Sequence, residues 1–165
     1  MKPKIRLSLL FSIALVVTIN ASWSPQAVGR QPNIVFFLAD DLGYREVGGY
    51  GQKIIRTPNI DKLIEEGMHF TQHYSGSPVC APSRCVLLTG KHPGHAYIRT
   101  NRFYPPEGNE PIPENTWTIA KMFQNSGYET GGFGKWGLGG VDSSGAALKQ
   151  GFDRFYGYYC QTHAH

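Results

Sequence analysis

The stretch Asn33–Asp41 reads NIVFFLADD, and it is the part of the sequence that decides the fold. The run from Asn33 to Ala39 is continuous, apolar and rich in Ile, Val and Phe, which is typical of a strand buried on both faces of a parallel sheet. Two adjacent carboxylates, Asp40 and Asp41, end the run abruptly. We therefore predict a buried strand over residues 33–39, with both acidic side chains just beyond its carboxyl end.

Helix and strand patterns alternate along the rest of the chain. The helix candidates carry Pro in the first turn or Gly at the end, and they cover residues 57–66, 82–88 and 118–126. Strands are predicted over residues 69–74 and 128–133. This alternation predicts an α/β fold with a mostly parallel central sheet flanked by helices. Ligands of such folds bind beyond the carboxyl ends of the strands, where Asp40, Asp41 and Lys135 are placed.

Length and charge restrict the function classes. The 165 residues fit one domain, and a composition of 41% hydrophobic and 17% charged residues is ordinary for a globular protein. The net charge of +4 includes three basic residues near the N-terminus. Without them, 13 basic residues face 12 acidic ones. This balance gives no electrostatic reason to expect nucleic acid as a partner.

The first 21 residues have the pattern of an export signal. A basic start precedes an apolar run from Leu7 to Ile19, and the small residues Ala21 and Ser22 offer a cleavage site. The run is too short for a helix that spans a bilayer, which needs about 20 residues, although a retained membrane anchor is the alternative. We expect residues 22–32 to form a short linker. We expect an exported protein, periplasmic or extracellular, in which disulfides are permitted.

The motif Cys80-Ala-Pro-Ser-Arg84, followed by Leu88-Thr-Gly90, resembles the signature of the sulfatase family. The same resemblance extends to other segments, namely residues 33–44, 57–61, 127–139 and 151–153. It implies that residues 33–165 are the N-terminal part of a catalytic domain of the arylsulfatase A type. The implied fold is the alkaline-phosphatase-like α/β fold, incomplete in this chain.

The resemblance also implies the chemistry of the site. In the family the residue at Cys80 is oxidised by the formylglycine-generating enzyme to formylglycine, whose hydrate attacks sulfate esters. Asp40 and Asp41, together with position 80, would bind Ca²⁺ or Mg²⁺; adjacent carboxylates repel each other unless a cation stabilises them, and their oxygens favour hard cations. Arg84 would hold the formylglycine, and Lys135 would contact both it and the sulfate. These positive charges would offset the repulsion between the ester and its nucleophile.

Two features depart from the family pattern. The family has a His two residues after the lysine, where this chain has Gly137. His163 and His165 are possible substitutes and are predicted to bind substrate, because a His-x-His pair on an extended segment shares one face. The family's remaining metal ligands and sulfate-pocket residues lie farther downstream. We therefore expect a truncated chain that lacks sulfatase activity by itself.

Several alternatives stay open. The leading hypothesis is a sulfuric ester hydrolase that acts on a sulfated small molecule or a sulfated carbohydrate. A phosphate or phosphonate monoester hydrolase of the same superfamily is the second, and an inactive truncated fragment is the third. If Cys80 is converted, Cys85 and Cys160 either form a disulfide or remain two separate buried thiols.

Overall fold

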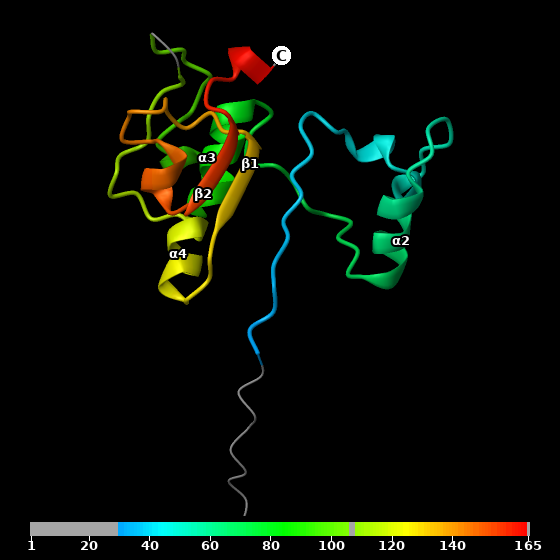
Figure 1. Ribbon diagram of the computed structural model, residues 1–165. Coiled ribbons are helices and arrows are strands. Elements are labelled where there is room, and N and C mark those ends of the chain that lie inside the picture. Colours follow the sequence, from blue (N-terminus) through cyan, green and yellow to red (C-terminus); the bar gives the residue numbers. More distant parts are fainter. Residues whose placement is uncertain (1–29, 106–107, 165) are drawn as a thin grey trace, which may run out of the picture. The chain divides into compact units, whose positions relative to one another are not determined.

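The structure is a computed structural model that describes residues 30–105 and 108–164 (Figure 1). The chain divides into two units, residues 1–39 and residues 40–165. The predicted export signal, residues 1–21, lies outside the described residues, as does most of the predicted linker. Among the described helices, none is both long enough and apolar enough to cross a membrane.

The described part of the first unit is an extended segment without helix or strand. The predicted strand over residues 33–39 is wrong for this structure, and the apolar side chains are exposed, Phe37 by 85%. A strand needs a neighbour that accepts its backbone hydrogen bonds. Among the described residues, the sheet contains only β1 and β2, so this run has no strand to pair with.

The second unit contains three α-helices and two strands in the described residues. In chain order they are α2 (Pro58–Glu66), α3 (Cys80–Thr89), α4 (Ile119–Asn125), β1 (Gly131–Lys135) and β2 (Arg154–Tyr158). Short 3-10 turns lie at Tyr44–Glu46, Gly48–Tyr50, Pro93–His95, Ala147–Gln150 and Thr162–Ala164. The three predicted helices are present within a few residues of their expected bounds. The predicted strand over residues 69–74 is absent, because no backbone pairing forms there.

Local signals in the sequence explain where the helices begin and end. The hydroxyl of Thr118 accepts a hydrogen bond from the Lys121 N–H at 3.2 Å and caps α4. Gly90 follows α3 with a φ of 65°, and its N–H donates to the Val86 carbonyl at 2.9 Å. This left-handed conformation suits glycine and ends the helix.

The two strands pair in parallel, which agrees with the predicted parallel sheet (Figure 1). Their register matches Gly131 with Arg154 and Lys135 with Tyr158. The backbones approach closely, because a Cβ at Gly157 would lie 1.9 Å from the Gly134 carbonyl oxygen. Both strands end at the same edge of the sheet, so Lys135 and the segment that follows Tyr158 emerge together.

One core cluster supports this edge. Its buried members are Ala81, Cys85, Ala96, Ile98, Ile112, Trp136, Leu138 and Ala147. The indole N–H of Trp136 donates to the Gly145 carbonyl at 2.8 Å, and its ring lies edge-on to Phe152. Because Ala81 and Cys85 belong to α3 and Trp136 follows β1, the cluster joins the helix to the end of the strand.

The cysteines are all free thiols. Cys85 and Cys160 are fully buried, and Cys80 is partly exposed. Of the two alternatives for Cys85 and Cys160, the structure therefore has separate buried thiols rather than a disulfide.

Candidate active site

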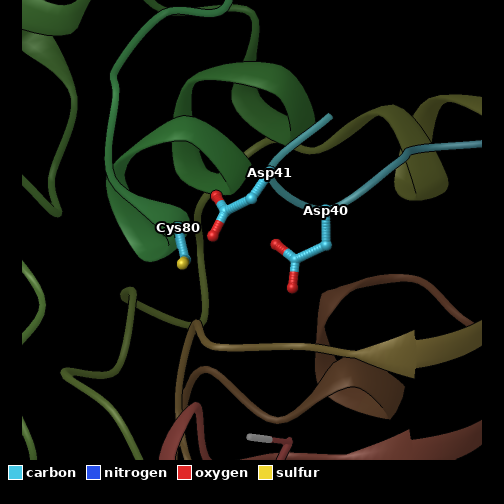
Figure 2. Close-up of side chains that lie close together, drawn as sticks. All are labelled: Asp40, Asp41 and Cys80. Atoms are coloured by element: carbon cyan, nitrogen blue, oxygen red, sulfur yellow. The ribbon is translucent and has the colours of Figure 1, made fainter. Parts of the chain in front are cut away.

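Two acidic residues begin the second unit, and backbone conformation directs their side chains. Asp41 has a φ of 56°, the one positive φ among the described residues other than glycine. Aspartate tolerates this left-handed conformation better than most residues. Figure 2 shows the carboxylates of Asp40 and Asp41 on the side of Cys80.

Cys80 is the first residue of α3, and its sulfur atom completes a cluster with the two acids. One ligand atom from each of Asp40, Asp41 and Cys80 lies within 4.8 Å of the other two (Figure 2). In the part of the chain that the structure describes, no other group of three or more His, Cys, Asp or Glu side chains is arranged in this way. The predicted metal-binding residues are thus brought together.

Lys135, the last residue of β1, links this cluster to the sheet. Its ammonium donates to Asp40 Oδ2 at 2.9 Å and to Cys80 Sγ at 3.5 Å. The side chain is only 7% exposed, so its charge has little solvent around it. A buried ammonium next to a nucleophile position is suited to binding an anionic group there.

Arg84 lies one helical turn beyond Cys80 and supplies a second positive charge. Its Nη1 donates to the Lys135 carbonyl, and its Nη2 lies 3.4 Å from Asp40 Oδ1. Its side chain is 13% exposed. Within residues 30–105 and 108–164, its buried Nε has no hydrogen-bond partner. The guanidinium therefore fixes Lys135 through the backbone and Asp40 through charge.

The electrostatics of the site favour an ionised Asp40. The hydrogen bond from Lys135, together with the charges of Lys135 and Arg84, holds the pKa of Asp40 below its usual value, and partial burial only opposes this shift. A carboxylate that stays ionised can serve as a cation ligand over the whole physiological pH range.

The donor set fits a hard divalent cation in two of its three positions. The carboxylates of Asp40 and Asp41 suit Ca²⁺ or Mg²⁺, whereas the sulfur of Cys80 suits softer metals. An oxygen in place of this sulfur would make all three donors hard. The chemistry of the donor set therefore fits a residue at position 80 that presents an oxygen.

Of the two histidines predicted to substitute at Gly137, His163 is not in the cluster: it is exposed and lies in the turn Thr162–Ala164. His165 lies outside the described residues, so the prediction for it stays a prediction. Instead, Gln161 fills the space beside Gly137: a Cβ there would lie 1.6 Å from Gln161 Nε2. Gln161 is only 5% exposed, and its side-chain Nε2 and Oε1 have no hydrogen-bond partner among the described residues.

Known proteins share this chain's sequence and fold. The family model described as Sulfatase matches residues 32–162. Arylsulfatase A of Homo sapiens is 44% identical over 137 residues, which cover 79% of this chain and 26% of that protein. N-acetylgalactosamine-6-sulfatase of Canis lupus familiaris is 37% identical over 158 residues, which cover 92% of this chain and 29% of that protein.

A solved structure shows the same likeness. The crystal structure of PsFucS1 sulfatase from Pseudoalteromonas sp. is 30% identical, with a TM-score of 0.70, and the match covers 95% of this chain and 30% of that one. This likeness confirms the predicted fold class. The chain spans about a quarter to a third of the length of the relatives it matches.

Proposed function

The chain belongs to the sulfatase family, and from this premise we propose that the protein hydrolyses sulfate esters. The reaction consumes one water: the ester gives up its sulfate as hydrogen sulfate, and the alcohol recovers its proton. The observation that carries the proposal is the convergence of Lys135 Nζ on Asp40 at 2.9 Å and on Cys80 at 3.5 Å. A buried cation thus lies beside the residue that bears the family nucleophile.

Position 80 would carry formylglycine, which supplies a hydrated aldehyde as the nucleophile. We propose that the formylglycine-generating enzyme is the partner that makes it. Asp40, Asp41 and position 80 would hold a divalent cation, and Ca²⁺ is the ion we propose, because it accepts flexible carboxylate ligation.

Lys135 and Arg84 supply the positive charges of the site. The Lys135 ammonium can donate to a sulfate oxygen and lower the repulsion that an anionic ester exerts on a nucleophile. Arg84 contacts both the Lys135 carbonyl and the Asp40 carboxylate, so it keeps the Lys135 ammonium and this carboxylate close to each other. Because both side chains are mostly buried, their charges are screened less than those of exposed residues.

The substrate class we propose is a sulfated small molecule or a sulfated carbohydrate. The names of two relatives support both, since one is an arylsulfatase and the other is named for a sulfated amino sugar. His163 and His165 remain proposed substrate contacts. We also propose that residues 1–21 direct export to the periplasm or the extracellular space; N-terminal sequencing of the mature protein would show cleavage near Ala21.

The decisive experiment compares two leaving-group-matched esters. The protein as encoded by its gene, produced together with a formylglycine-generating enzyme, is given an aryl sulfate and the corresponding aryl phosphate. We expect kcat/KM to favour the sulfate. Faster turnover of the phosphate would replace the proposal with a phosphate monoester hydrolase of the same superfamily. Production without the modifying enzyme serves as the control for formylglycine.

A further inference from the structure

The first turn of α3 is closed by a side chain that comes from outside the helix. Val79, at the N-cap position, makes no side-chain capping bond. Pro82 has no N–H, and the Ser83 N–H already donates to the Val79 carbonyl at 3.0 Å. The N–H of Ala81 donates to Asn101 Oδ1 at 3.0 Å. Asn101 therefore provides the cap that the helix lacks in its own sequence.

Asn101 is held in place on both sides. Before it, Ile98 is fully buried in the same core cluster as Ala81. After it, the Arg102 carbonyl accepts hydrogen bonds from the Glu110 N–H at 3.1 Å and from Asn109 Nδ2 at 3.3 Å. The loop that presents the Asn101 amide is thus anchored by core packing before Asn101 and by hydrogen bonds after it.

The capped N–H belongs to the peptide that joins Cys80 to Ala81. A hydrogen bond to this N–H fixes the plane of the peptide, because the peptide unit is rigid. The orientation of this plane restricts the ψ angle of Cys80, and with it the direction of the Cα–Cβ bond from which the side chain starts. On the other side of Cys80, the Lys135 ammonium contacts the sulfur at 3.5 Å. The side chain is therefore oriented from the backbone and from its tip.

We propose that Asn101 is a positioning residue that orients position 80 toward Asp40, Asp41 and Lys135. This role rests on the sulfatase function proposed above. Asn101 acts only through the backbone of α3 and needs no contact with substrate. Asn101, 21 positions beyond Cys80 in sequence, thus joins the residues on which the rate of the reaction depends.

The test uses Asn101→Leu, which removes the acceptor, and Asn101→Asp, which keeps it and places a negative charge at a helix N-terminus, where it is favourable. The control is Asn125→Leu, at the exposed end of α4. All variants are made in the protein as encoded by its gene and produced with a formylglycine-generating enzyme. Activity is normalised to the modified fraction, measured by mass spectrometry, well below the melting temperature of each variant.

We expect Asn101→Leu to lower kcat for an aryl sulfate about 10- to 100-fold, with a smaller change in KM. Asn101→Asp should recover most of kcat, and Asn125→Leu should leave it unchanged. Hydrogen exchange should show faster exchange at Ala81 in Asn101→Leu alone. This exchange measurement does not depend on activity, so it separates a failed cap from a failed sulfatase function.

Two results would overturn the proposal. Unchanged exchange at Ala81 in Asn101→Leu would show that Asn101 does not cap α3. Faster exchange with kcat equal to that of the unsubstituted protein would show that the cap stabilises the helix without orienting position 80. If the unsubstituted protein hydrolyses no sulfate ester, the proposed function fails and the positioning role fails with it, whereas the exchange result still decides the cap.

Discussion

Asp40 receives both positive charges of the site on one carboxylate. Lys135 contacts Oδ2 and Arg84 lies near Oδ1, and both cations are more deeply buried than the carboxylate that they share. These contacts hold the pKa of Asp40 below its usual value of 3.8. The ion pairs therefore contribute stability above that pH, and the contribution is lost as the pH falls through the lowered pKa.

Replacing Lys135 by Met should raise the pKa of Asp40 toward its usual value, because the leading hydrogen bond and one charge are removed. The stability difference between the unsubstituted protein and Lys135→Met should be present at neutral pH and fade in acid below about pH 4. Titration of the Asp40 carboxyl carbon by NMR measures the shift. Lys149→Met, at an exposed site on a 3-10 turn, is the control. An unchanged Asp40 titration in Lys135→Met would contradict the contact.

Cys80→Ser should limit the protein to one sulfate transfer, from the ester to the serine, with no further turnover. The Ser hydroxyl can attack sulfur, pass its proton to solvent or a nearby base, and release the alcohol. It has no second hydroxyl on the same carbon to expel the sulfate. We expect mass spectrometry after incubation with an aryl sulfate to find a sulfated serine at position 80 and no sustained release of the alcohol. Normal turnover without an adduct would show that position 80 is not the nucleophile.

At the scale of elements, the end of β1 depends on a pair of residues that are distant in sequence. Gly137 has a φ of 85°, and Gln161 fills the space that a side chain there would need. Gly137→Ala should therefore combine backbone strain with overpacking and lower the free energy of unfolding by about 2–4 kcal/mol. Chemical denaturation of the variant measures this loss.

A matched glycine separates the two contributions. Gly127 has a φ of 83°, and a Cβ added there would meet no atom within 4 Å, so Gly127→Ala should cost only the strain, about 1 kcal/mol. Adding Gln161→Gly to Gly137→Ala should recover the overpacking part. Equal losses of unfolding free energy in Gly127→Ala and Gly137→Ala would mean that the Gln161 side chain moves aside without an energetic cost.

Local signals predicted the helices well and the strands poorly. Pro82 lies in the first turn of α3, Gly90 follows its end, and Gly127 follows the end of α4. The signals for these boundaries are therefore local in sequence. The strand β2 was not predicted. Its sequence RFYGY has a glycine between two tyrosines, which interrupts the pattern of a strand, and its pairing partner lies more than 20 residues away. The apolar run 33–39 has the composition of a strand but no partner among the described residues.

At the scale of the whole molecule, the sequence predicted which side chains lie close together better than it predicted the sheet. Asp40, Asp41, Cys80 and Lys135 were all predicted from motifs, and the structure brings them together. Asn101 and Gln161 were not predicted, because each acts through a tertiary contact with a residue at least 20 positions away. No local pattern distinguishes such an amide from one on the surface.

The number of ligands in the site limits how tightly the chain can bind a cation. Asp40, Asp41 and position 80 offer three ligand side chains among the described residues, whereas Ca²⁺ takes 6–8 oxygens. We expect the purified 165-residue chain to bind Ca²⁺ weakly, with Kd in the millimolar range or above. Calorimetry measures this affinity, with Asp40→Asn as the control for specific binding. Submicromolar binding that Asp40→Asn abolishes would show that these three side chains suffice.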